Sequence, residues 1–102
     1  MPRDREGVDQ LVQKLRQNAE ANRDNEAVFN QLQQIGEPAV SKLIPLLQDK
    51  TPKVRSSAAS TLGSMRESAK SAIPSLIPLL KDQDKWVRSS ATQALKKLGY
   101  QP

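Results

Sequence analysis

A stretch of about 20 residues occurs twice in the chain, 33 residues apart, and it constrains the fold more than any other feature. The letters Leu-Ile-Pro-Leu-Leu, an Asp two residues later, and Val-Arg-Ser-Ser-Ala begin at Leu43 in one copy and at Leu76 in the other. Leu62 and Leu95 close the two copies at the same offset. Repeats of this length are typical of stacked architectures, in which each unit buries its apolar face against its neighbours.

Apolar residues at helical spacing predict helices along the whole chain, and the alternation typical of strands is absent, so the fold class is all-α. The expected helices cover roughly residues 8–21, the segment between Asn25 and Gly36, residues 38–48, 52–64 and 70–81, and the segment from Asp84 to Leu98. In order, these about six helices form three hairpins over residues 8–36, 37–66 and 67–99. We expect a right-handed α-solenoid in one domain, residues 8–102, after a flexible N-terminus, residues 1–7.

Prolines and glycines mark where these helices bend or end. Pro45 lies inside the third predicted helix and removes one backbone hydrogen bond, so a bend is expected there. Pro74 and Pro78 lie four residues apart in the fifth helix, which must start late or be bent. Gly36 and Gly99 stand where left-handed C-terminal caps are expected.

The first hairpin is a degenerate copy of the other two. Leu11 and Leu15 take the places of Leu76 and Leu80, but Asp24–Asn25 stands where the clear copies have Val-Arg. Terminal repeats of such arrays are atypical because one of their faces meets water instead of a neighbour.

The composition excludes several classes of protein. Aromatic residues make up only 3% of the 102 residues, so the core must come from Leu, Ile, Val and Ala. The chain has no Cys and no His, which removes disulfides, thiol nucleophiles and the commonest base and metal ligand. We expect no enzyme activity, no cofactor and no metal. The chain shows neither an apolar run of about 18 residues nor a secretory signal, so a cytoplasmic protein without a membrane span is expected.

The net charge of +5 is unevenly distributed along the chain. Residues 1–36 carry a net charge of −1, whereas residues 37–102 carry +6. This basic excess suggests an acidic protein partner, an anionic membrane surface or a nucleic acid. Nucleic acid is the weaker alternative, because aromatic side chains for base stacking are nearly absent.

The segment Ala72–Ala91 resembles a HEAT repeat and, more narrowly, the HEAT-like repeats of the phycobilisome lyase type. That type shows a Leu-Pro-x-Leu helix, an Asp-x-Asp turn and then Val-Arg-x-x-Ala-Ala. The copy from Ile35 to Gly63 matches nearly as well, with Ser41 in the place of Pro74. The resemblance implies a scaffold or adaptor that binds a partner protein; the narrower one implies a bilin lyase-like or phycobiliprotein chaperone subunit.

The resemblance also implies a ladder between repeats, in which each Asp caps the second helix and is linked to an Arg of the neighbouring repeat. Its members are Asp49, Arg55, Asp82 and Arg88. The first hairpin lacks this pair. From the residues alone, Thr51 and Asp84 are the expected N-caps of the fourth and sixth helices.

The resemblance places the second helix of each hairpin on the concave face, where partners usually bind. The residues expected to contact a partner are Lys53, Ser57, Ser60, Lys85, Trp86, Ser89, Gln93 and Lys97. The first hairpin would add Glu26, Phe29, Asn30 and Gln33.

Trp86 is the sharpest single signal, because the other copy has Lys53 in its place. It is either an interface anchor or, the favoured interpretation, a cover for the open end of the last repeat, shared with Leu98 and Tyr100. Open repeat ends can also stack, so a monomer or a weak end-to-end dimer is expected.

Overall fold

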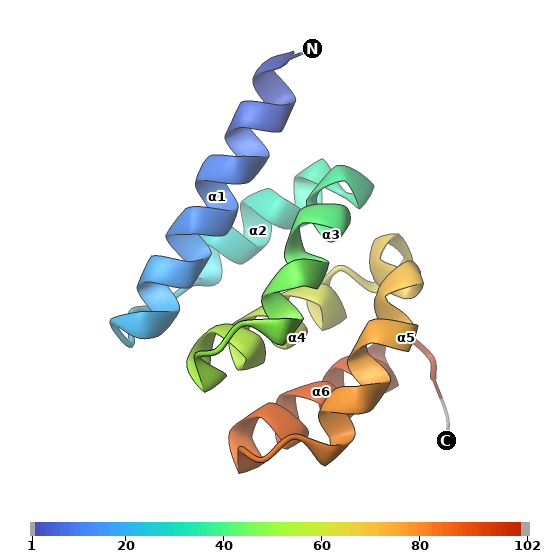
Figure 1. The fold of residues 1–102 in the computed structure, drawn as a ribbon. Coiled ribbons are helices and arrows are strands. Elements are labelled where there is room, and N and C mark those ends of the chain that lie inside the picture. The colour runs from blue at the N-terminus through green and yellow to red at the C-terminus, as the bar shows by residue number, and fades with distance from the viewer. Residues whose placement is uncertain (1, 101–102) are drawn as a thin grey trace.

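The computed structural model describes residues 2–100, and every regular element among them is a helix (Figure 1). Short 3-10 helices, η1 to η3, separate some of the α-helices. In chain order the elements are α1 (Pro2–Glu20), α2 (Glu26–Ile35), α3 (Glu37–Leu43), η1 (Ile44–Gln48), α4 (Pro52–Ser64), η2 (Arg66–Ala72), α5 (Ile73–Leu76), η3 (Ile77–Lys81) and α6 (Lys85–Lys97). The predicted all-α solenoid of helical repeats is confirmed.

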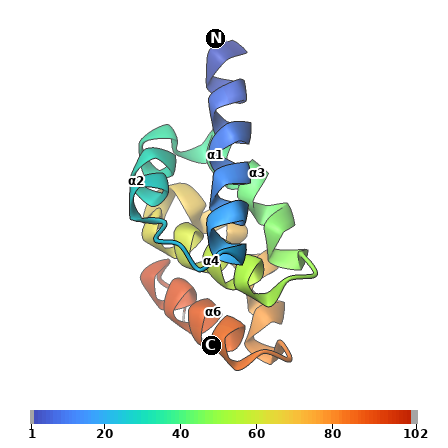
Figure 2. The same ribbon diagram turned by 90° about the vertical axis from the view of Figure 1, so that its left-hand side faces the viewer.

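The helices form two layers, which Figures 1 and 2 show from two sides. One layer contains α1, α3 and α5, and the other contains α2, α4 and α6. The hairpins follow one another in chain order, so α1 and α2 lie at one end of the row and α5 and α6 at the other (Figure 1). The most extensive packing joins α4 to α6. The second helices of the hairpins therefore provide the main junction between the last two repeats.

Small aliphatic side chains fill the space between the layers, as the composition predicts. The largest fully buried side chains include Leu15, Leu32, Leu43, Leu62 and Leu76. Where α4 meets α6, the contact is closer than side chains normally allow: a Cβ added to Gly63 would lie 2.7 Å from the Cα of Ala94. The two helices approach this closely because Gly63 has no side chain.

Two of the predicted helices differ in type from the structure, and prolines explain both differences. The helix predicted over residues 38–48 divides into α3 and η1 next to Pro45. The helix predicted over residues 70–81 is a single α-helical turn, α5, between η2 and η3. Pro74 and Pro78 lack the amide that an α-helix needs and crowd the preceding turn, so the backbone tightens into 3-10 turns. The change from α3 to η1 falls at the position where a bend was predicted.

Gly36 and Gly99 follow helix ends as predicted, whereas the start of the first helix differs from the prediction. Gly36 and Gly99 adopt φ values of +81° and +87°, and their amides donate to the carbonyls of Leu32 and Lys96. However, α1 begins at Pro2, well before the predicted start at residue 8, because proline is well suited to a first helical turn. The predicted flexible N-terminus, residues 1–7, is thus helical from residue 2, and Met1 lies outside the described residues.

Candidate functional site

An arginine–aspartate pair links the second hairpin to the third. Nε of Arg55, on α4, lies 2.9 Å from Oδ2 of Asp82, and Nη2 lies 3.0 Å from Oδ1. Nη1 of Arg55 also donates to the carbonyl oxygen of Asp49, at 2.7 Å. The Arg55 and Asp82 side chains are only 16% and 10% exposed, so water screens the pair weakly. The structure thus places these two residues together, as the predicted ladder requires.

The contacts of Asp82 determine its pKa. Burial of the carboxylate raises the pKa, but the hydrogen bonds from Arg55 and from the Asp84 amide lower it, as do the charges of Arg55 and Arg88. The lowering effects prevail, and the pKa of Asp82 lies below its usual value of 3.8. Asp82 is therefore ionised at neutral pH and holds its guanidinium partner as a carboxylate.

The first hairpin takes part in the ladder through a residue that the repeat pattern did not identify. Nη2 of Arg16, on α1, lies 2.9 Å from Oδ1 of Asp49. The first hairpin lacks the Asp–Arg pair of the clear copies, but a guanidinium on its first helix makes the link to the second hairpin. Successive hairpins are therefore joined by Arg16 with Asp49 and by Arg55 with Asp82.

The ladder aspartates brace turns and do not cap helices, which corrects the role that the resemblance implied. Asp49 accepts a hydrogen bond from the Thr51 amide at 2.9 Å, and Asp82 accepts one from the Asp84 amide at 2.9 Å. Asp84 is the side chain that caps α6, since its Oδ1 accepts from the amides of Trp86 and Val87. Thr51 is at the N-cap of α4, but its side chain makes no capping hydrogen bond.

Arg88 holds in the third hairpin the place that Arg55 holds in the second. Its Nη1 donates to the carbonyl oxygens of Asp82, at 2.6 Å, and of Gln83, at 3.1 Å. The described part of the chain provides no carboxylate in a salt bridge with Arg88. Like Arg55, Arg88 therefore binds the backbone of the turn in its own hairpin. Unlike Arg55, it makes no salt bridge with an aspartate of a following hairpin in the described residues.

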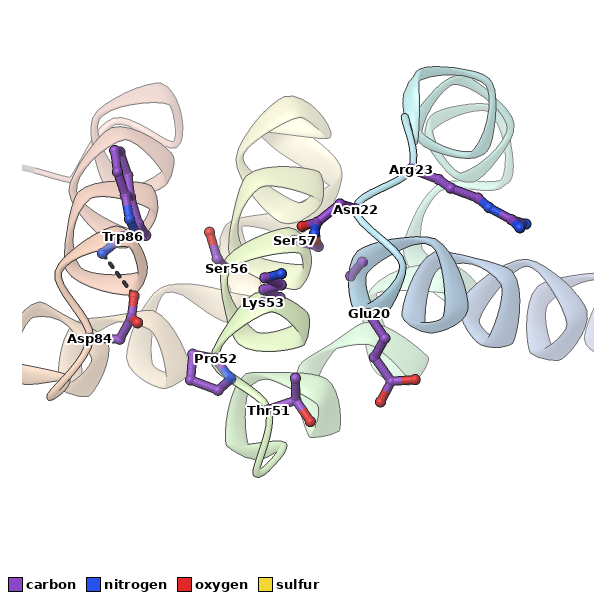
Figure 3. Close-up of a pocket in the computed structure, with 11 residues that line it drawn as sticks. Glu20, Asn22, Arg23, Thr51, Pro52, Lys53, Ser56, Ser57, Asp84 and Trp86 are labelled. Atoms are coloured by element: carbon purple, nitrogen blue, oxygen red, sulfur yellow. Dashed lines mark hydrogen bonds between the residues drawn. The ribbon is translucent and has the colours of Figure 1, made fainter.

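A groove of about 800 Å³ extends across all three hairpins, close to the starts of α4 and α6 (Figure 3). Its walls come from the end of α1 and the turn after it, from the beginning of α4, and from the beginning of α6. Most of the lining residues are polar or charged, among them Glu20, Asn22, Arg23, Lys53, Ser56, Ser57 and Asp84, and the ring of Trp86 lies with them. The groove is thus a composite site that no single repeat could form.

Trp86 is the largest apolar side chain that lines this groove. Its side chain is 68% exposed, and among the described residues no other large hydrophobic side chain is exposed. Nζ of Lys85 lies 5.4 Å from the ring centroid, within the range of a cation–π contact. This exposure does not fit the favoured interpretation that Trp86 covers the end of the last repeat.

The charged groups of the groove balance in formal charge. Arg23 and Lys53 contribute two positive charges, and Glu20 and Asp84 contribute two negative ones. However, Asp84 is already bound to the first amides of α6, where the helix dipole offsets its charge. The groove is therefore close to neutral in formal charge, and the helix dipole at Asp84 leaves Arg23 and Lys53 only partly offset by the carboxylates.

The structure brings together only some of the residues predicted to bind a partner. Lys53, Ser57 and Trp86 line the groove, and Lys85 lies next to it through its contact with the Trp86 ring. The remaining predicted residues do not line it: Ser60, Ser89, Gln93 and Lys97. They lie further along α4 and α6, whereas the groove is confined to the first turns of these helices.

The first hairpin contributes to the groove residues other than those predicted to contact a partner. Its lining residues are at the end of α1 and in the α1–α2 turn, whereas the prediction chose outward positions of α2. Gln33 of α2 instead donates to the carbonyl oxygen of Ser64, and Phe29 packs against the core. The sequence feature that could have pointed to these lining residues is the polar break at Asn22 and Arg23. In the structure, Asn22 adopts a left-handed conformation there, with φ of 59°.

The described residues contain no cluster of three or more His, Cys, Asp or Glu side chains that could hold a metal ion. None of the described helices has the length and apolar character needed to cross a membrane.

Comparison with protein families agrees with this geometry. The family model for HEAT repeats matches residues 8–96, which includes all three hairpins and the groove. This match is to HEAT repeats in general and does not distinguish the phycobilisome lyase type. A search of curated proteins found no match.

Proposed function

The chain belongs to the HEAT-repeat family, and on this premise we propose that it is a non-catalytic scaffold or adaptor whose partner protein binds in the groove. HEAT repeats commonly serve as interaction scaffolds, and their surfaces rather than their cores decide which partner is bound. A cytoplasmic location and a monomeric or weakly dimeric state stay predictions.

The exposure of Trp86 is the observation that carries this proposal. A tryptophan left 68% exposed keeps most of its apolar ring in water, although burying it would be favourable. Tryptophan is among the residues most enriched at the energetic centres of protein interfaces. In this chain the ring lines a groove, where a partner side chain can cover it from more than one side.

The surroundings of the ring favour a partner with acidic residues. Arg23 and Lys53 line the same groove, on separate hairpins, so a segment that runs from Trp86 toward the first hairpin would pass both cations. The complementary ligand is a polypeptide segment that places an apolar side chain on Trp86 and carboxylates near these two cations.

The two alternative functions receive less support from the groove. A nucleic acid would bring phosphates against Glu20 and Asp84 as well as the cations, and it would find one aromatic ring for stacking. A bilin lyase-like or phycobiliprotein chaperone subunit stays a prediction from the narrower resemblance, because no feature of the groove favours a tetrapyrrole over a protein segment.

The test uses Trp86 as its own reporter, since the chain contains one Trp. A partner recovered from the native host by affinity capture is purified and titrated into the wild-type chain. If it binds in the groove, the exposed ring becomes buried and its fluorescence emission shifts to shorter wavelength. Anisotropy of a labelled partner then gives affinities for Trp86→Ala and Lys53→Glu, each expected to bind about tenfold more weakly or worse.

The matched control is Lys14→Glu, which makes the same charge change at an exposed position of α1 outside the groove. It should bind the partner nearly as well as the wild type does. If Trp86→Ala and Lys53→Glu both keep wild-type affinity, or if Lys14→Glu weakens binding as much as they do, the groove is not the binding site.

A further inference from the structure

Among the described residues, Arg88 makes only one of the two kinds of contact that Arg55 makes, the hydrogen bond to the turn of its own hairpin. Nη1 of each arginine donates to the carbonyl oxygen of the ladder aspartate before its own helix, at 2.7 Å for Arg55 and 2.6 Å for Arg88. Arg55 then places Nε and Nη2 on the carboxylate of Asp82. The described chain offers Arg88 no such carboxylate, and its side chain is exposed. Arg88 is therefore a guanidinium fixed by its own hairpin with two donor groups unused.

The helix surface around Arg88 also differs from its counterpart on α4. Ala59 and Gly63, which follow Arg55 at four-residue spacing, are buried. The equivalent residues on α6, 33 positions later, are Thr92 and Lys96, and both are exposed. Because residues four apart lie on one side of a helix, Arg88, Thr92 and Lys96 form a single polar and basic stripe. We call this stripe the outer flank of α6; α6 lies at the end of the row of hairpins (Figure 1).

We propose that the outer flank of α6 binds an acidic turn of another protein, whose carboxylate takes at Arg88 the place that Asp82 takes at Arg55. Paired guanidinium–carboxylate hydrogen bonds are strong and orient both partners. Lys96 adds a second positive charge about 12 Å along the helix, so a segment with two separated carboxylates is complementary. Leu80, in the same hairpin, is only partly buried, whereas its counterpart Leu47 is 1% exposed.

Two other occupants fit this flank less well. A helix packed as α6 packs on α4 would meet Lys96 where Gly63 permits the close approach. A second copy stacked head to tail would bring the wrong groups: alignment of the first hairpin with the third places Gln17 at the position of Asp82, with the cationic Arg16 beside it. The complementary partner is therefore a carboxylate-bearing turn of a different polypeptide.

This site is separate from the groove. The groove is lined by Asp84 and Trp86 at the start of α6, and no residue of the outer flank lines it. The two sites can be tested independently, and loss of binding at one leaves the other intact.

The experiment uses the isotope-labelled full chain and a capped peptide that copies residues 79–84, Leu-Leu-Lys-Asp-Gln-Asp, because this segment carries the Asp82 carboxylate that Arg55 binds. Nuclear magnetic resonance follows the side-chain Nε–H of Arg88 and the backbone amides of Thr92 and Lys96. We expect a saturable shift centred on Arg88 that weakens as salt is raised. A control peptide with Asp82→Asn should bind at least about fivefold more weakly.

Variants of the full chain separate a paired contact from simple attraction between charges. Arg88→Gln should abolish the localised shift, while Arg88→Lys, which keeps the charge but loses the paired geometry, should bind with intermediate affinity. The exposed Arg23→Gln, in the groove, should leave the shift unchanged. Because Arg88 is exposed, its variants should remain folded, and the unperturbed resonances of the core confirm this in the same spectra.

Three outcomes would overturn the proposal. Shifts centred on Arg23 would place the acidic turn in the groove. Shifts spread evenly over the lysines and insensitive to Arg88→Gln would show only unspecific attraction. A dimer of the chain alone, observed by sedimentation and abolished by Arg88→Gln, would make a second copy the occupant of the flank.

Discussion

Replacing Gly63 by alanine should destabilise the protein, although the same substitution usually strengthens a helix. In an exposed helix interior, glycine to alanine gains about 1 kcal/mol, because alanine loses less backbone freedom on folding. At Gly63, however, the new methyl carbon would lie 2.7 Å from the Cα and 2.9 Å from the Cβ of Ala94. Carbon atoms that are not bonded to each other normally stay about 3.5–4.0 Å apart. The two helices would therefore have to move apart.

The size of this loss follows from where the clash falls. A main-chain atom cannot rotate away as the end of a flexible side chain can, so α4 and α6 must separate along the most extensive interface of the molecule. Overpacking costs about 1–3 kcal/mol, and a clash with main chain belongs at the upper end of that range. After the gain in helix propensity is subtracted, we expect a net loss of about 2 kcal/mol. For a domain of this size, that lowers the unfolding midpoint by about 8 °C.

Thermal and urea unfolding followed by circular dichroism measure this loss, with Gly7→Ala as the matched control. A Cβ added to Gly7 on α1 meets nothing within 4 Å, so this variant should be more stable by about 0.5 kcal/mol. Adding Ala94→Gly to Gly63→Ala should rescue stability only in part, since it removes the clash with the methyl group of residue 94 and leaves the clash with the main chain there. Equal or greater stability of Gly63→Ala relative to the wild type would refute the close approach of α4 and α6.

Three further predictions concern the ladder and the helix caps. Arg55→Met should lower the free energy of unfolding by about 3 kcal/mol, because it leaves the largely buried Asp82 carboxylate without its cation. Arg88→Met should lower it by less than about 1 kcal/mol. Chemical unfolding compares the two variants, and equal losses would contradict the asymmetry of the ladder. Folding lowers the pKa of Asp82, so the stability that this carboxylate contributes is complete above its unfolded-state pKa and is lost as pH falls below about 4. The unfolding midpoint of the wild type should therefore fall more steeply with acid than that of Asp82→Asn. Parallel curves for the two proteins would argue against this linkage. Asp84→Ala should cost about 1 kcal/mol in thermal unfolding because it removes two capping hydrogen bonds, while Thr51→Ala at the equivalent position should cost clearly less, since that side chain makes none.

The two repeated segments made the fold predictable, because their apolar residues follow helical spacing closely and residues typical of helix starts and ends flank their helices. Thr51 and Asp84 precede helices that begin where expected, and Gly36 and Gly99 follow helix ends with positive φ values. The type of helix around Pro45 was not predictable from spacing, because α and 3-10 turns place apolar residues on nearly the same face over so short a segment.

The groove was harder to predict because its walls are distant in the sequence. The α1–α2 turn, with Asn22 and Arg23, meets the start of α4 some 30 residues later and that of α6 after another 33. The first hairpin has lost the repeated letters, so alignment with the clear copies does not show which of its residues face them. The role of Arg16 was not predicted for the same reason. It lies on α1, whereas the repeat pattern places the ladder cation on the second helix of each hairpin.

The mismatches between the two clear copies acquire a physical meaning once the copies are placed in the stack. Lys53 against Trp86 falls in the groove, where each hairpin adds a different group to one shared surface. Gly63 against Lys96 falls on the flank, where the earlier copy must admit a neighbouring helix and the later copy bears an exposed charge. Residues that are identical in both copies, such as Arg55 and Arg88, differ only in what the stack brings to them. A repeated sequence therefore encodes the junction between hairpins, and a carboxylate from another protein can use at Arg88 the recognition that the chain uses internally at Arg55.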